Sequence, residues 1–332
     1  MKIAVIYEGL LGAAWSLSDG LTSTLKRMGH QVEEWPLGRP HSRPLHAEYL
    51  KLADLILASG LEHYANNPPG MVAGIPTKEW DAIKVPKVAW FHESFFRDDR
   101  SFDFTTIRPH ADFFFFPAFQ DAVMFAGLNF GASEVCHWLP AGVDTEVFKV
   151  VDGTNREIPA AFIGSFYPKR VAYLNSLLRH IKVPFMAGGG VAVNDIEGVN
   201  PLETVKRLAY NYSRIQVFLN LPAYSRLLVT KVYEAMACGC MMVTPSLSGT
   251  AEANMDPFQH AKHIVYYKET NLGFVNQILR EYIEREDDRR LIAACGQQEI
   301  ILNHTLEQRL EKLLRLSSSA TPDEEKVKLV IP

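Results

Sequence analysis

The residues whose types and spacing most clearly suit ligand chemistry lie at the start of a helix expected over residues 230–237. An apolar strand over residues 215–219 and a loop precede this helix, whose first turn carries Thr230 and Lys231. The N-terminus of a helix has unpaired N–H groups and a positive dipole end, so it suits phosphate groups. Lys231 adds a full positive charge there and Thr230 adds a hydroxyl. The pattern predicts a phosphate site.

Glu234 follows one helical turn later, on roughly the same face as Lys231. Its carboxylate can accept hydrogen bonds from two vicinal hydroxyls, such as those of ribose. A phosphate site beside a ribose site indicates a nucleotide. In the plainer alternatives, Glu234 caps or salt-bridges its own helix and Lys231 is a solvated surface charge.

A second candidate for anion binding follows a strand expected over residues 160–163. Gly164 and Ser165 form a turn, and Arg170 lies in the first turn of a helix expected over residues 168–178. A cation at a helix N-terminus is unfavourable unless an anion accompanies it. Arg170 is therefore a candidate anion ligand.

The candidate catalytic residues of the first half are His92 and Glu93, which follow a strand expected over residues 87–91. They enter a loop at the end of that strand, so we expect them to point into a ligand cleft. Either could act as a base on an acceptor hydroxyl or orient that hydroxyl. In the alternative, His92 is a hydrogen-bonded histidine of the cleft wall.

Short apolar strands alternate with segments of helical spacing along the whole chain. Continuous apolar strands indicate a sheet that is covered on both faces, and helices between parallel strands indicate a doubly wound α/β fold. The expected strands cover residues 2–7, 31–35, 53–58, 87–91, 112–116, 160–163, 183–187, 215–219, 241–244 and 263–267.

A polar stretch over residues 149–159 separates two regions with this pattern. A chain of 332 residues is also longer than most single cores. We therefore expect an α/β protein with two doubly wound Rossmann-like domains, residues 1–150 and 151–305, that face a cleft at the carboxyl ends of both sheets. Residues 306–332 are expected to form the end of the last helix and a tail.

Composition narrows the classes of function. The net charge is −4, with −5 over residues 1–150 and +1 over residues 151–332, so a nucleic-acid acceptor stays open but is not indicated. Four cysteines without a C-x-x-C pair favour neither a disulfide scaffold nor a metal site, and they suggest a reduced, cytoplasmic compartment. No apolar stretch approaches the ~20 residues of a membrane helix. Nothing in the composition indicates the oligomeric state.

A known family shares several of these motifs. The run over residues 233–239 (YEAMACG) resembles the E-A-x-A-C-G signature of group 1 glycosyltransferases, which have the two-domain GT-B fold. Further stretches are similar to the CgeB-like, or spore maturation, branch of that group: F-x-G-S-x-Y-P-x-R at residues 162–170, a basic residue at Lys231, and H-T-x-x-x-R at residues 304–309. The resemblance covers most of residues 85–315.

The resemblance implies a glycosyltransferase of the hexosyltransferase type that uses a nucleotide-diphosphate sugar as co-substrate and needs no other cofactor. It makes Arg170 and Lys231 a basic pair for the diphosphate and Glu234 the ribose ligand. It places His92 near a position that is often functional in this group. The remaining donor-binding positions that it implies are Gly12, Gly164, Ser165, Arg226 and Thr230.

The chain departs from the group at one position. Many retaining members carry a glutamate eight residues before the position of Glu234, and this chain has Arg226 there. The chain has no Asp-x-Asp motif, which favours metal-independent transfer with cations that stabilise the leaving diphosphate. The resemblance favours retention of the anomeric configuration. If His92 or Glu93 acts as a base from the opposite face, inversion results.

Two other functions stay open at this stage. An NAD-type oxidoreductase requires G-x-G-x-x-G after the first strand, and the chain offers only Gly9 and Gly12, with Glu33 or Glu34 for a ribose. A non-catalytic sugar- or nucleotide-binding module would keep the fold without turnover. Arg226, in place of the glutamate, would then reflect the loss of catalysis.

Overall fold

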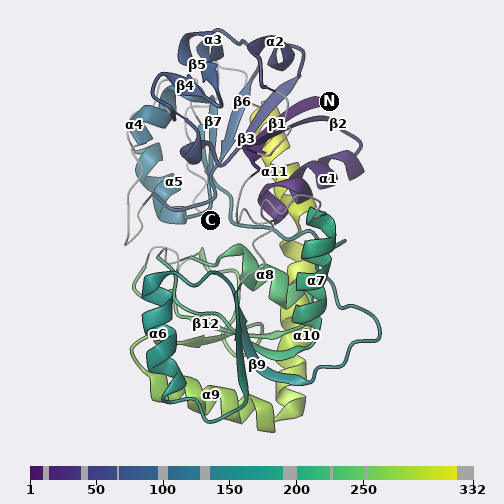
Figure 1. The fold of residues 1–332 in the computed structure, drawn as a ribbon, viewed down its shortest axis with the longest axis vertical. Helices are drawn as coiled ribbons and strands as arrows, with labels where there is room; N and C mark the ends of the chain where they lie inside the picture. Colours follow the sequence, from purple (N-terminus) through teal and green to yellow (C-terminus); the bar gives the residue numbers. More distant parts are fainter. Residues whose placement is uncertain are drawn as a thin grey trace. The chain divides into compact units, whose positions relative to one another are not determined.

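The computed structural model describes residues 1–9, 15–38, 44–65, 67–95, 104–127, 135–189, 200–224, 227–250, 253 and 255–319. The chain divides into two compact units, Met1–Pro140 with Glu307–Pro332, and Ala141–Leu306. Each unit contains a parallel sheet with helices on its faces (Figure 1). Each is therefore Rossmann-like, and the predicted α/β fold class is confirmed.

The sheet of the first unit has six strands in the order β2-β1-β3-β6-β7-β8, and every neighbouring pair is parallel. Every residue of β3 and β7 is buried, as expected for strands covered on both faces. A short antiparallel hairpin forms a separate sheet. The strands are β1 (Lys2–Glu8), β2 (Gln31–Leu37), β3 (Leu55–Ser59), β4 (Met71–Val72), β5 (Ile75–Pro76), β6 (Lys87–Trp90), β7 (Phe113–Phe116) and β8 (Val135–Trp138).

The helices of the first unit enclose an aromatic core. Phe91, Phe104, Phe114 and Phe125 belong to one buried cluster. The helices are α1 (Asp19–Arg27), α2 (Ala47–Leu50), α3 (Thr77–Asp81), α4 (Phe104–Ile107), α5 (Phe119–Ala126) and α11 (Leu306–Ser319), with 3-10 turns η1 (Trp15–Leu17), η2 (Leu61–His63) and η3 (Arg108–His110). An ion pair of 3.7 Å between Arg27 and Glu307 joins α1 to α11.

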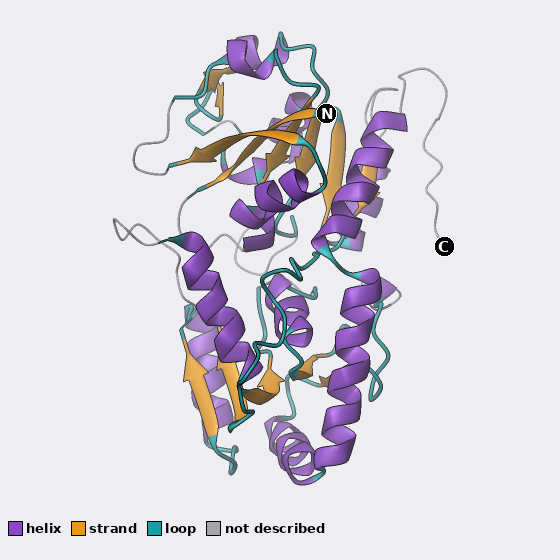
Figure 2. Ribbon diagram, turned by 90° about the vertical axis from the view of Figure 1, so that its right-hand side faces the viewer, coloured by secondary structure: helices purple, strands orange, loops and turns teal. Residues whose placement is uncertain are grey.

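The sheet of the second unit has five parallel strands in the order β10-β9-β11-β12-β13. Its strands are β9 (Ile158–Ile163), β10 (Phe185–Gly188), β11 (Ile215–Leu219), β12 (Met241–Pro245) and β13 (Val265–Tyr267). Its helices are α6 (Pro168–Leu178), α7 (Pro201–Ser213), α8 (Thr230–Ala237), α9 (Leu272–Glu284) and α10 (Glu286–Asn303). Figure 2 shows the strands of this sheet between helices.

Helix α8 is enclosed by its own unit, because every residue from Val232 to Ala237 is buried. Small residues such as Ala235 and Ala237 allow this close packing. Gly239 ends the helix with φ +75°, a left-handed conformation that favours glycine. The strand–helix–strand context expected for residues 215–244 is therefore present.

The two units differ in extent from the domains expected at residues 1–150 and 151–305. The first unit contains the chain up to Pro140 and again from Glu307 onwards. In the segment expected to hold the end of a helix and a tail, residues 306–319 form a separate helix, α11, whose inner-face residues Leu310 and Leu313 are fully buried. Within the described residues, no helix is long and apolar enough to cross a membrane.

Candidate functional site

The donor-binding residues predicted in the second unit gather at one edge of its sheet. β9 and β11 are parallel neighbours, so their carboxyl ends lie at the same edge. Gly164 and Ser165 directly follow β9, and the loop after β11 leads to Thr230 and Lys231 at the start of α8. Gly12 and Arg226, the other two predicted positions, lie outside the described residues.

Lys231 reaches from α8 to the end of β9. Its ammonium lies 5.0 Å from the centroid of the Phe162 ring. It also lies so close to the Gly164 backbone that a Cβ at residue 164 would overlap Nζ. A glycine at this turn therefore leaves space for the lysine ammonium, which the Cβ of any other residue would displace.

Arg170 is buried, with 3% of its surface exposed, and it joins the loops after β9 and β11. Its NH1 donates to the carbonyl oxygen of Ser165 (2.7 Å), and its Nε donates to that of Pro222 (3.3 Å). The guanidinium also lies 4.2 Å from the centroid of the Tyr167 ring. Arg170 therefore stabilises the loops while it places a positive charge at the same edge as Lys231.

The charges at this edge are poorly compensated. Burial and, to a smaller extent, the nearby Arg170 cation lower the pKa of Lys231 to about 7, whereas Glu234 opposes this shift. Burial also raises the pKa of Glu234 to about 7, against the attraction of Lys231. Among the described residues, neither the Lys231 ammonium nor the Glu234 carboxylate has a hydrogen-bond or ion-pair partner. Two cations near one another without a bound anion form a site that favours an anionic ligand.

Tyrosines that the sequence reasoning missed hold these loops in place. The Tyr167 and Tyr224 rings stack at 4.4 Å, and the Tyr167 hydroxyl donates to the Pro222 carbonyl at 3.1 Å. The Tyr267 hydroxyl, at the end of β13, donates to the Asn220 carbonyl at 2.8 Å. In the sequence, Tyr167 directly precedes the helix expected over residues 168–178 and Tyr267 ends the strand expected over residues 263–267, whereas Tyr224 lies in a loop without such a signal.

The first unit holds the predicted catalytic residues in the loop after β6. His92 and Glu93 both lie there and are partly exposed. The Nε2 atom of His92 is 2.6 Å from the hydroxyl oxygen of Ser59, the last residue of β3. Burial, with a smaller effect of His63, lowers the pKa of His92 to about 3. His92 is therefore neutral near pH 7, which suits a hydrogen-bonding role better than that of a strong base.

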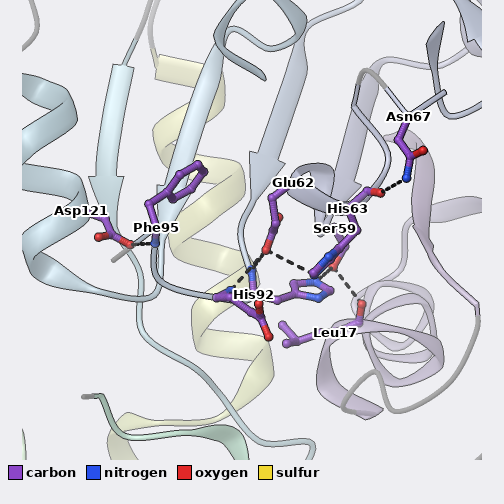
Figure 3. Close-up of polar contacts among 9 residues, drawn as sticks. Leu17, Ser59, Glu62, His63, Asn67, His92, Phe95 and Asp121 are labelled. Carbon is purple, nitrogen blue, oxygen red and sulfur yellow. Dashed lines mark hydrogen bonds and ion pairs between the residues drawn. The ribbon is translucent and has the colours of Figure 1, made fainter. Parts of the chain in front are cut away.

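Two buried carboxylates fix the backbone of this loop, and both were missed by the sequence reasoning. Glu62 Oε1 accepts hydrogen bonds from the backbone N–H of His92 (2.7 Å) and of Glu93 (3.2 Å). Asp121 accepts from the backbone N–H of Phe95 at 2.9 Å. Figure 3 shows these contacts on both sides of the loop. Because each carboxylate comes from another element, the loop is held at both of its ends.

Within the described ranges, no group of three or more His, Cys, Asp or Glu side chains could hold a metal ion. Cys238 and Cys240 are buried free thiols, and Cys136 and Cys295 are partly buried free thiols.

Comparison with known proteins agrees with this arrangement. Residues 154–315 match the model of a family described as glycosyl transferase-like. The match contains the whole edge formed by Gly164, Arg170, Lys231 and Glu234. With two Rossmann-like units and this domain, the protein is a glycosyltransferase enzyme of the GT-B fold. The oxidoreductase alternative is therefore set aside.

Several solved structures share the fold over 96% of this chain. HepE of Anabaena, in complex with UDP-glucose, is 14% identical, with a TM-score of 0.64 and 100% of its own chain covered. The sucrose-phosphate synthase of Thermosynechococcus elongatus is 12% identical, with a TM-score of 0.63 and 100% of its chain covered. An alpha-glucosyltransferase, in complex with UDP-glucose and DNA containing an abasic site, is 12% identical, with a TM-score of 0.64 and 99% of its chain covered. No curated protein sequence matches the chain.

Proposed function

We propose that the protein transfers a sugar from a nucleoside-diphosphate sugar, whose diphosphate binds at Arg170, Lys231 and the N-terminus of α8. Glu234 then accepts hydrogen bonds from the ribose. The observation that carries this proposal is the pair of cations at one sheet edge, where the Lys231 ammonium has no hydrogen-bonded or ion-paired partner among the described residues. A diphosphate supplies the missing negative charge and accepts hydrogen bonds from both cations.

The comparisons suggest the donor to test first. HepE and the alpha-glucosyltransferase are both in complex with UDP-glucose. Uridine diphosphate sugars are therefore the first donors to test with this chain. The similarity of residues 162–170 to the F-x-G-S-x-Y-P-x-R stretch supports our placement in the CgeB-like branch.

The chemistry follows from the charges of the site. The bond between the anomeric carbon and the diphosphate breaks, and Arg170 and Lys231 stabilise the charge that develops on the leaving group. The acceptor hydroxyl oxygen bonds to the anomeric carbon, and its proton passes to the departing diphosphate. Attack from the face that the diphosphate leaves gives retention. This route needs no metal ion and no carboxylate at position 226. The neutral His92 orients a substrate hydroxyl.

The acceptor carries a hydroxyl group, and the charge of the first half argues against a polyanion. One similar structure contains DNA. Residues 1–150 of this chain, however, carry a net charge of −5, which disfavours long-range attraction of nucleic acid. We therefore propose a neutral or cationic acceptor.

Donor binding and turnover test the proposal together. Calorimetry with UDP should show that Lys231→Ala weakens binding roughly tenfold or more, since a charged hydrogen bond contributes about 1.5–3 kcal/mol. The control is Lys206→Ala, which removes an exposed lysine that pairs with Glu203 on α7. A panel of nucleotide sugars should identify a donor from which nucleotide is released. Equal affinity of both variants for UDP would contradict the proposed donor site, and binding without release would favour a non-catalytic module.

Transfer itself is tested with chelator and product analysis. We expect full activity in excess chelator and a retained anomeric configuration by NMR. Activity that is lost in chelator and restored by a divalent ion would refute the metal-independent route. An inverted product would instead favour His92 or Glu93 as a base.

A further inference from the structure

The hydroxyl of Ser59 determines where His92 carries its proton. Ser59 is fully buried at the end of β3. Its oxygen lies 2.8 Å from the carbonyl oxygen of Leu17 and 2.6 Å from Nε2 of His92. A serine hydroxyl has one proton, and a carbonyl oxygen can only accept. Both contacts are hydrogen bonds only if Ser59 donates to Leu17 and His92 Nε2 donates to Ser59.

The position of the His92 imidazole is restricted by contacts on two sides. Glu62 holds the backbone N–H of His92. On the other side, the ring lies against Gly60, where a Cβ would be 2.9 Å from Cε1 and 3.1 Å from Nδ1 of His92. Gly60 has φ +75°, which also favours glycine. The Nδ1 atom accepts no hydrogen bond from a described residue.

We propose that Ser59 is a positioning residue that holds His92 in its Nε2–H tautomer, so that Nδ1 accepts a hydrogen bond from a substrate hydroxyl other than the reacting one. This inference rests on the proposed function of sugar transfer. In the opposite tautomer, Nδ1–H would be a donor, and a substrate hydroxyl would have to turn its lone pair towards it. The tautomer therefore selects how the hydroxyl is oriented.

Nuclear magnetic resonance reads the tautomer without any substrate. In protein labelled with ¹⁵N in the histidine rings, His92 is assigned by comparison with His92→Gln. The wild-type ring should show a protonated Nε2 and an unprotonated Nδ1 at pH 7. Ser59→Ala removes the acceptor that Nε2–H has among the described residues, so we expect a mixture of both tautomers. A protonated Nδ1 in the wild type, or an unchanged Nε2–H tautomer in Ser59→Ala, would overturn the inference.

Kinetics then test the role in transfer. Ser59→Ala should lower kcat about tenfold, the size expected for one misdirected hydrogen bond, and leave the affinity for UDP unchanged. Ser59→Thr keeps the hydroxyl and should recover both the tautomer and most of kcat. A wild-type kcat in Ser59→Ala, combined with a strong loss in His92→Ala, would overturn the role of Ser59 and leave the proposed function intact.

Failure of the proposed function gives a different pattern. In that case the wild-type protein neither binds UDP nor releases nucleotide from any donor, which also overturns the substrate contact of Nδ1. The tautomer seen by NMR does not depend on that result. The two failures are therefore distinguishable in the same set of proteins.

Discussion

At the residue scale, the protonation of Lys231 should change when a donor binds. The pKa of Lys231 is lowered to about 7 by burial and by Arg170, so at pH 8 the side chain is mostly neutral in the unliganded protein. A diphosphate favours the charged ammonium and raises this pKa again. Above pH 7, Lys231 therefore takes up a proton from solvent when the diphosphate binds.

We predict that UDP binding at pH 8 takes up close to one proton per site. Calorimetry in two buffers of different ionisation enthalpy measures this number. Lys231→Arg should bind UDP without proton uptake, because arginine is always protonated. Glu234→Gln should keep the uptake, since Glu234 has a pKa of about 7 and is already ionised at pH 8. Equal uptake by wild type and Lys231→Arg would contradict the prediction.

The turn after β9 gives a second prediction at the residue scale. Gly164→Ala should weaken UDP binding about tenfold, because the new methyl group displaces the Lys231 ammonium and its charged hydrogen bond to the diphosphate. Gly189→Ala is the matched control, because its Cβ would make only ordinary contact, 3.8 Å from the Phe166 ring. Calorimetry compares the two variants. Similar affinities would mean that Lys231 does not need its observed position.

Arg170 has backbone partners as well as a place at the start of a helix. The sequence placed a cation at a helix start, where an anion is expected. In the structure, two loop carbonyls already accept hydrogen bonds from its guanidinium. Arg170 therefore has a structural function in addition to the electrostatic one that we propose.

At the element scale, the end of α8 depends on a contact between distant segments. Arg156, before β9, donates to the carbonyl oxygen of Cys238 at 2.6 Å and to that of Ile215 at 2.7 Å. Gly239 leaves room for this guanidinium, because a Cβ at residue 239 would lie 2.5 Å from NH2 of Arg156. The helix that carries Lys231 and Glu234 is thereby fixed at the end opposite to the proposed donor site.

We predict that Gly239→Ala destabilises the second unit more than Gly153→Ala does. Both glycines have φ near +75°, so both substitutions carry the left-handed penalty of about 1–2 kcal/mol. Only Gly239→Ala also disturbs Arg156, since a Cβ at Gly153 meets no atom within 4 Å. The difference in the free energy of unfolding should be about 2 kcal/mol, the range of one charged hydrogen bond. Equal urea denaturation curves would disprove it.

At the scale of the whole molecule, the chain leaves the first unit at Pro140 and returns to it at Glu307. Helix α11 is therefore sequence-distant from the sheet that it stabilises. Arg309 of α11 donates to the carbonyl oxygen of Pro140 at 3.1 Å, so the place where the chain leaves this unit is tied to the place where it returns. The last helix belongs to the core of the first unit.

We predict that Leu313→Ala destabilises the first unit by about 2–5 kcal/mol, the usual effect of emptying a buried leucine site. Hydrogen exchange should show faster exchange of amides in β1 and β3, with those of β9 and β11 unchanged. Leu302→Ala, at a side chain that is 57% exposed, serves as the control and should have little effect. Loss of protection in β9 and β11 would contradict the assignment of α11 to the first unit.

The sequence by itself determined most of the strands, several helices, the α/β class and the edge at which Gly164, Lys231 and Glu234 gather, but not the hairpin β4–β5, strand β8 or helices α2 to α5. These features are local, because apolar runs, helical spacing and the order strand–loop–helix place side chains at the carboxyl end of a parallel strand. Only the tertiary structure decided which remote groups meet there. Lys231 against Gly164, Ser59 on His92 and α11 in the first unit join segments that packing brings together, and no spacing along the chain encodes such contacts. The lowered pKa values of Lys231 and His92 also required the structure, because burial is their main cause.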